Sequence, residues 1–140
     1  MKVQPTKSLQ LMTFHHIGVA TLNIEASSAA YSLLGYKVGL SIYDPNQKVN
    51  LCFLEKENAP TIELVSPTEE ASPVNNIIKK NGTMPYHTCF EVEDIENQIL
   101  TLKKNKFMVV VKPITAIAFD NRRVAFLFNK DAGLIELLEK

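Results

Sequence analysis

The sequence predicts an α+β fold in which one strand-helix-strand-strand-strand (βαβββ) module occurs twice in tandem. Elements of the same type follow one another in the same order in each half of the chain. Both halves carry a histidine in the first strand and a glutamate in the last. His16 and His87 are 71 residues apart, and Glu63 and Glu136 are 73 residues apart. A repeat of this length is one supersecondary unit used twice, and a pseudo-twofold axis should bring equivalent positions close together.

The first module is expected at about residues 14–67. Strand-like runs predict its strands, and a helical segment that Gly35 ends follows the first of them. Turn-prone Asp, Asn, Pro and Glu residues separate the later strands. The expected ranges are 14–20 (strand), 23–34 (helix), 36–43, 49–55 and 60–66 (strands).

The second module is expected at about residues 85–139, after a linker helix at about 72–82. Asp94 is a typical N-terminal capping residue, and Ile95, Ile99 and Leu102 share one face of the helix that follows it. The expected ranges are 86–92 (strand), 94–104 (helix), 107–114, 123–128 and 134–138 (strands).

Length and charge indicate one domain, residues 1–140, that acts on a small molecule. The chain has 140 residues, and its fifteen acidic residues are interspersed with fifteen basic ones. This charge pattern predicts no binding to nucleic acid or to an anionic membrane. The N-terminal stretch 1–12 lacks the apolar core of a signal peptide, and no apolar run approaches the roughly 20 residues of a membrane span. We therefore expect a soluble, cytoplasmic protein that could form a homodimer. Cys52 and Cys89 are expected to be reduced core residues.

Four strand residues form the candidate site: His16, Glu63, His87 and Glu136. Both glutamates lie in apolar runs, and a buried carboxylate is costly unless it is paired or bound to a metal. A single strand histidine is more often a core or surface residue than a ligand, so the argument rests on the matched pairs. Two imidazoles and two carboxylates suit a divalent Zn, Fe, Co, Ni or Mn ion.

Neighbouring residues are expected to play smaller parts. Strand alternation sends His16 to one face and His15 to the other, so His15 should point away from the site, at the surface or in the second shell. Tyr86 precedes His87 in the same way, so it should also lie at the surface or in the second shell. Lys112, Arg122 and Arg123 could meet an anionic substrate group, although basic residues beside turns are usually just solvated.

Several motifs resemble the vicinal-oxygen-chelate superfamily, which includes glyoxalases, bleomycin resistance proteins and dioxygenases, and most closely its methylmalonyl-CoA epimerases. The motifs lie at residues 16–20, 62–67, 72–73, 87–95 and 126–137, and the resemblance extends over 14–139. It implies that the strands form a curled mixed sheet, a cup around one divalent metal ion with helices on the outside. It places the four candidate residues at the ligand positions and implies an acyl-CoA thioester substrate.

The resemblance implies proton transfer at a carbon next to a carbonyl, with Glu136 as one candidate base. A further glutamate found on the third strand of some epimerases aligns with Leu51, so Glu63 is the candidate for the second base. Alternatives are a glyoxalase I-like lyase, an Fe(II) ring-cleaving dioxygenase-like enzyme and a non-catalytic small-molecule-binding resistance protein. Glu63 disfavours the dioxygenase because a fourth protein ligand occupies a position that oxygen and substrate need. The complete ligand set disfavours the binding protein.

Overall fold

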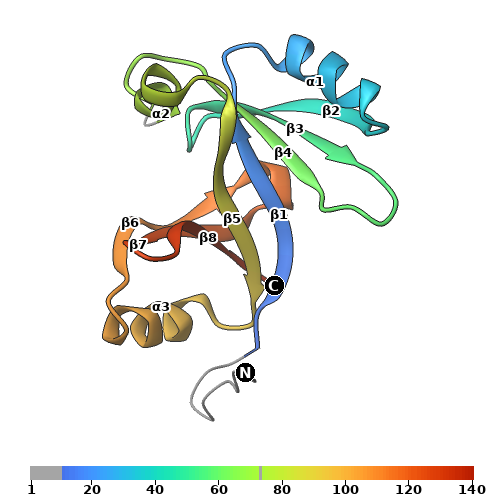
Figure 1. Ribbon diagram of the computed structural model, residues 1–140. Helices are drawn as coiled ribbons and strands as arrows, with labels where there is room; N and C mark the ends of the chain where they lie inside the picture. The colour runs from blue at the N-terminus through green and yellow to red at the C-terminus, as the bar shows by residue number, and fades with distance from the viewer. Residues whose placement is uncertain (1–10, 73) are drawn as a thin grey trace.

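The computed structural model describes residues 11–72 and 74–140, which form an eight-stranded mixed sheet with three α-helices (Figure 1). The elements are β1 (Thr13–Ala20), α1 (Ile24–Leu33), β2 (Lys37–Asp44), β3 (Val49–Glu55), β4 (Ile62–Pro67), α2 (Val74–Asn81), β5 (Met84–Val92), α3 (Ile95–Lys104), β6 (Met108–Ala116), η1 (Ile117–Phe119), β7 (Arg122–Asn129) and β8 (Gly133–Glu139). The predicted order of strands and α-helices is confirmed; only the 3₁₀ turn η1 was not expected.

Residues 1–10, where the sequence shows no signal-peptide core, and Pro73 in the expected linker helix lie outside the described part of the chain. In the ranges that are described, none of the helices has the length and apolarity to cross a membrane.

The two module helices begin and end at equivalent positions. Asn23 caps α1 by accepting a hydrogen bond from the backbone N–H of Ala26, and Asp94 caps α3 in the same way. These caps satisfy backbone donors that have no partner inside the helix. Gly35 and Lys106 follow the two helices with φ of 96° and 70°, a left-handed conformation that turns the chain into the next strand. Local sequence therefore sets both helix ends in each module.

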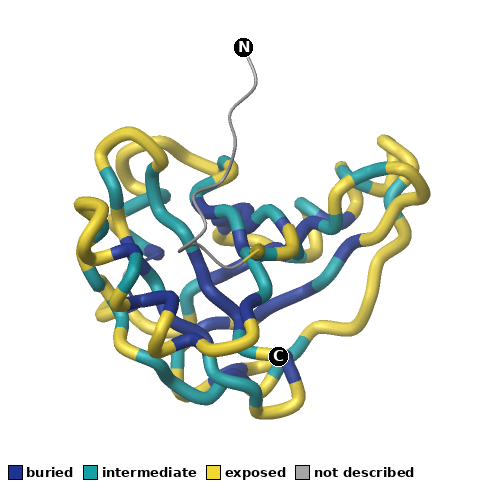
Figure 2. The backbone as a smooth tube through the Cα atoms, turned by 90° about the horizontal axis from the view of Figure 1, so that it is seen from below, coloured by how far each residue is buried: buried dark blue, intermediate teal, exposed yellow. Residues whose placement is uncertain are grey.

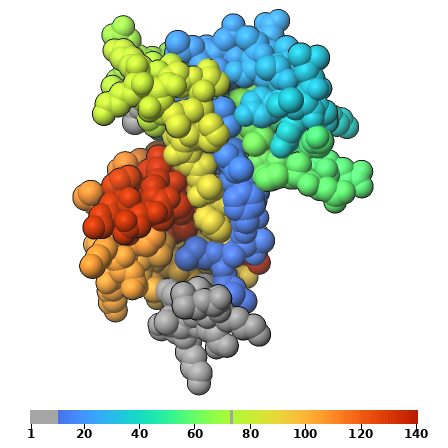
Figure 3. Space-filling model, in the orientation of Figure 1, coloured from blue at the N-terminus to red at the C-terminus, as the bar shows by residue number. Residues whose placement is uncertain are grey.

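The modules join edge to edge through antiparallel pairing of β1 with β5. The strand order is β2-β3-β4-β1-β5-β8-β7-β6, with β1 parallel to β4 and β5 parallel to β8. Figure 3 shows β1 and β5 side by side between the two modules. Ile17 pairs with Thr88, which is its equivalent in the repeat, so the pseudo-twofold axis passes through this pair.

The curled sheet has a different apolar layer on each face. On the outer face α1 packs over β3 and β4, and α3 packs over β7 and β8. Inward-facing residues of both modules form two further apolar clusters, one of which includes residues of α2. Buried residues follow the central strands, and exposed ones gather in the loops, in α1 and in the edge strand β2 (Figure 2). The α+β cup is confirmed, with α1 and α3 on its outside.

Close packing at the β1–β5 junction requires a glycine at position 18. Gly18 pairs with His87, and a Cβ atom built on Gly18 would lie 2.0 Å from Cε1 of the His87 ring. Any side chain at this position therefore competes with the imidazole for the same space. The ring cannot give way easily because His87 is buried.

We predict that Gly18→Ala lowers the free energy of unfolding by about 1–3 kcal/mol, the usual range for overpacking a core. Gly18→Val should be worse, since it adds two further methyl groups against the same ring. Urea denaturation of the two variants and the parent chain measures the effect. An alanine variant as stable as the parent would show that the His87 ring is not confined by the backbone of Gly18.

Candidate active site

Four buried side chains from four different strands converge at the centre of the cup. His16 comes from β1, Glu63 from β4, His87 from β5 and Glu136 from β8. Their relative exposures are between 0 and 3%. One possible ligand atom of each lies within 4.8 Å of the others. The structure thus brings together all the residues that the sequence repeat singled out.

The donor atoms are spaced as ligands of a common ion would be. His16 Nε2 lies 3.2 Å from His87 Nε2, 3.1 Å from Glu136 Oε1 and 3.3 Å from Glu63 Oε1. His87 Nε2 lies 3.1 Å from Glu136 Oε1 and 3.6 Å from Glu63 Oε1. Ligand atoms about 2.0–2.2 Å from a tetrahedral ion are roughly 3.3–3.6 Å apart, which is close to these values.

The electrostatics of the four groups are strongly coupled. Burial disfavours the charged form of His16, but the carboxylates of Glu63 and Glu136 outweigh it and raise the pKa of His16 to about 10. Burial also disfavours the Glu136 carboxylate, but the nearby side chains of His16 and His87 lower the pKa of Glu136 to about 2. Two buried carboxylates therefore demand positive charge between them, from protons on the imidazoles or from a cation.

Buried polar atoms without a hydrogen-bond partner also indicate that hydrogen bonds alone do not satisfy the site and that a cation would. Among the described residues, Glu136 Oε1 and His87 Nδ1 are buried without a hydrogen-bond partner of good geometry. Buried polar atoms are rarely left so. A divalent ion would balance the two carboxylates and supply Glu136 Oε1 with a partner. The donor set therefore fits the divalent metal that the sequence predicts.

A cavity of about 320 Å³ opens beside the four residues. Its wall is mainly apolar and comes from both modules and from α2, including Leu51, Val65, Ile77, Val111 and Phe126. Of the described residues that line it, Glu63 alone carries a carboxylate. Leu51 is 2% exposed and contributes only apolar surface. An apolar group that enters this cavity would thus meet the site from the side of Glu63.

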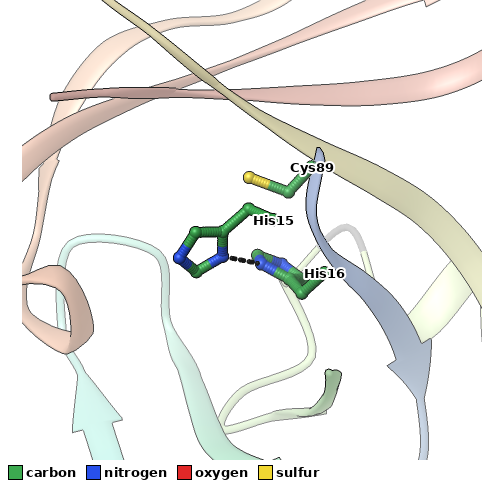
Figure 4. Close-up of side chains that lie close together, drawn as sticks. All are labelled: His15, His16 and Cys89. Carbon is green, nitrogen blue, oxygen red and sulfur yellow. Dashed lines mark hydrogen bonds between the residues drawn. The ribbon is translucent and has the colours of Figure 1, made fainter. Parts of the chain in front are cut away.

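His15 lies beside His16, which is one of the two positions expected for it, but the predicted direction away from the site is wrong. Between Phe14 and His16 the ladder to β5 contains a bulge, so strict alternation fails there. His15 Nδ1 lies 2.9 Å from His16 Nδ1, which places His15 in the second shell of the candidate site (Figure 4). Tyr86 occupies the equivalent bulge in β5, and its ring packs against His87 and lines the cavity. Both residues are therefore part of the site's surroundings.

Aromatic rings that do not line the cavity pack against His16. The Phe119 ring stacks on the His16 ring at 5.8 Å, and Phe53 meets it edge-on at 6.0 Å. Phe119 also packs edge-on against His15. Sequence reasoning missed Phe119 because it lies in η1, and no periodic pattern predicts which strand such a short turn will cover.

Lys112, Arg122 and Arg123 do not reach the site, although another basic residue, Lys48, lines the cavity. Arg122 donates a hydrogen bond to Glu91, and Arg123 is ion-paired with Glu96 and Glu139. Lys112 is exposed and does not line the cavity. The alternative that these residues belong to the solvated surface is therefore favoured.

Burial of both cysteines as free thiols confirms another prediction. Burial and the carboxylates of Glu136 and Glu63 raise the pKa of the Cys89 thiol. Cys89 is the residue of β5 that pairs with His16 of β1.

The chain is similar to known epimerases in sequence and structure. A sequence model of the glyoxalase/bleomycin resistance protein/dioxygenase superfamily matches residues 15–126. The chain is 32% identical to the mitochondrial methylmalonyl-CoA epimerase of Dictyostelium discoideum over 130 residues, which cover 90% of this chain and 77% of that protein. It is 33% identical to an ethylmalonyl-CoA/methylmalonyl-CoA epimerase of Cereibacter sphaeroides over 127 residues, 88% of this chain and 94% of that protein.

A solved structure agrees with these relatives. A single-residue variant of the Streptomyces coelicolor methylmalonyl-CoA epimerase, in complex with 2-nitronate-propionyl-CoA, superposes with a TM-score of 0.78 at 25% identity, over 94% of this chain and 96% of that one. The chain therefore belongs to the glyoxalase/bleomycin resistance protein/dioxygenase superfamily and, within it, to the methylmalonyl-CoA epimerase family.

Proposed function

We propose that the protein is a metal-dependent epimerase of an acyl-CoA thioester of the methylmalonyl-CoA type. The observation that carries the proposal is the convergence of His16, Glu63, His87 and Glu136 beside an apolar cavity. Relatives named for methylmalonyl-CoA and ethylmalonyl-CoA support this substrate class. The glyoxalase, dioxygenase and binding-protein alternatives receive no support from these relatives.

The four convergent residues would hold one divalent cation, with Zn, Co, Ni, Mn and Fe all compatible with two imidazoles and two carboxylates. When bound, such an ion supplies Lewis-acid polarisation of a carbonyl oxygen. His16 and His87 would present Nε2, because in both side chains this is the nitrogen that faces the other donors. Glu63 and Glu136 would each contribute a carboxylate oxygen.

Epimerisation requires one group to remove a proton from a carbon and another to return a proton on its opposite face. Glu63 and Glu136 lie on equivalent strands of the two modules and are the carboxylates that the repeat places in the cup. Leu51 cannot carry a proton. Glu63 lines the cavity and is suited to meet the substrate directly, while Glu136 would act from deeper in the site.

The cavity wall would exclude water from the reacting carbon. Its residues beside Glu63 include Leu51, Val65 and Phe126, which offer no polar side-chain atoms. A dry wall strengthens electrostatic interactions in the site and protects a carbanionic intermediate from unselective protonation. The same wall would accept the alkyl branch of the acyl group.

We predict that His16→Ala and His87→Ala each lose most of the bound divalent metal, because each removes one of four donors. Elemental analysis of purified protein measures the metal, and circular dichroism checks the fold. Thr88→Ala is the control, since Thr88 neighbours His87 in β5 but is not one of the four convergent residues. Unchanged metal content in both histidine variants would remove this site from the proposal.

We predict that Glu63→Gln and Glu136→Gln each lower turnover by about 10²- to 10⁴-fold, the usual worth of general acid or base assistance. Metal should remain in part, because an amide oxygen can still coordinate. Exchange of solvent deuterium into each stereoisomer of methylmalonyl-CoA measures proton removal from the two faces separately.

Glu55→Gln is the matched control, because Glu55 is exposed at the end of β3 and does not line the cavity. Wild-type exchange and turnover in Glu63→Gln would mean that the second base lies elsewhere, and the two-glutamate mechanism would be abandoned.

A further inference from the structure

The bulge in β1 brings a second histidine into contact with one of the candidate ligands. His15 Nδ1 lies 2.9 Å from His16 Nδ1 (Figure 4). His16 Nε2 faces Glu63, His87 and Glu136. Both ring nitrogens of His16 therefore have a partner. His15 contacts Nδ1, while Nε2 faces the other three candidate ligands.

Two nitrogens at this distance share one proton, so one donates and the other accepts. A neutral imidazole that binds a metal through Nε2 must carry its proton on Nδ1, because the binding nitrogen needs a free lone pair. The contact therefore has a direction when His16 acts as a ligand: His16 Nδ1–H donates, and His15 Nδ1 accepts.

We propose that His15 is a positioning residue that fixes the tautomer and the ring orientation of His16, so that Nε2 is presented to the metal. The inference rests on the proposed role of His16 as a ligand. Metal-bound histidines generally donate their other N–H to a carboxylate, a backbone carbonyl or water. Here an adjacent histidine takes that place, and only a break in strand alternation allows neighbours in sequence to face one another in this way.

The surroundings of His15 hold its ring in place. Phe119 meets the His15 ring edge-on at 5.5 Å and stacks on His16, so one aromatic ring supports both histidines. Behind Phe119 lies the Arg122 guanidinium, 6.0 Å from the ring centre and ion-paired with Glu91. Phe119 thus limits the freedom of the His15 ring, and the Arg122–Glu91 ion pair packs against Phe119 in turn.

The other histidine ligand is held by different means. At the equivalent bulge stands Tyr86, whose ring packs edge-on against His87 at 4.5 Å. Gly18 lies directly under the His87 ring, and His87 Nδ1 has no hydrogen-bond partner among the described residues. Packing therefore positions His87, whereas a hydrogen bond positions His16. This difference makes Tyr86 the natural control for His15.

An uncharged acceptor also suits the charge of the site. Glu63 and Glu136 together match a divalent cation, so a third carboxylate beside His16 would leave excess negative charge in the buried site. A neutral imidazole accepts the hydrogen bond without adding charge.

His15, His16 and Cys89 also have donor atoms within 4.8 Å of one another, which raises the alternative of a second ion. The 2.9 Å between the two Nδ1 atoms is a hydrogen-bond distance. Nitrogens about 2.0–2.1 Å from a shared tetrahedral ion would lie farther apart, at roughly 3.3 Å. The 2.9 Å separation is also shorter than the 3.1–3.6 Å between donors of the four-residue site, so the geometry favours the hydrogen bond.

Three variants test the proposal. His15→Phe keeps a ring against Phe119 but removes the acceptor, and His15→Asn places an oxygen acceptor as many bonds from the backbone as Nδ1. Tyr86→Phe alters the equivalent bulge without touching His16. Zn²⁺ affinity is measured by competition with a chromophoric chelator, and the His16 tautomer by long-range ¹H–¹⁵N NMR of the ring with and without Zn²⁺.

We expect His16 Nδ1 to carry a proton in both states of the parent chain. His15→Phe should bind Zn²⁺ about 10- to 100-fold more weakly, the usual effect of removing an outer-shell partner. His15→Asn should recover most of that affinity, and Tyr86→Phe should leave the His16 tautomer unchanged. Thermal melts of the zinc-free variants separate these effects from a loss of folding.

The proposal is overturned if His16 binds Zn²⁺ through Nδ1, if His15→Phe binds it as tightly as the parent, or if His15→Asn is as weak as His15→Phe. A second equivalent of Zn²⁺ that is lost with His15 would instead establish the three-residue ion site and overturn the hydrogen bond. A parent chain that binds no Zn²⁺ or other divalent metal would refute the proposed function. The Nδ1 proton in the metal-free chain would still decide whether His16 donates to His15.

Discussion

The antiparallel pairing of β1 with β5 is the interaction on which the rest of the site depends. This ladder places the pseudo-twofold axis at Ile17 and Thr88, and His16 and His87 then stand diagonally across it on the same face of the sheet. A shift of one residue would send one set of side chains to the opposite face. The backbone of Gly18 enforces this arrangement, because the His87 ring fits only where a Cβ atom is absent.

Burial of charge is the second constraint, because it explains why the four side chains are arranged as metal ligands would be. The last strands of the modules bring Glu63 and Glu136 to the same buried point, where two negative charges are unfavourable without a counter-charge. Without a cation, a proton on His16 can supply this counter-charge, because the two carboxylates raise the pKa of His16 to about 10. A divalent cation supplies a greater positive charge, and its binding would displace protons from the imidazoles.

The repeat made the sequence unusually informative, because two independent copies of one pattern predict the same elements and the same functional positions. Helix ends could be predicted from local signals such as Asn23 and Asp94. His15 could not be placed correctly, since a bulge depends on how two distant strands pair and not on the residues of one strand. The ion pair of Arg122 with Glu91 could not be predicted either, because the two residues are 31 positions apart in the chain.

Pseudo-symmetry places the four donors at equivalent positions of the two modules, but the residues around the donors are not symmetric. The site is therefore open to a cavity from one side. On one side of His16 the rings of Phe53 and Phe119 fill the cup. The cavity, by contrast, is lined by Tyr86 and by residues of both modules, without these two rings. The two carboxylates are therefore not equivalent, since Glu63 lines the cavity and Glu136 does not. A twofold arrangement of candidate ligands thus becomes a one-sided site, and a substrate bound in the cavity would approach Glu63 and Glu136 from different directions.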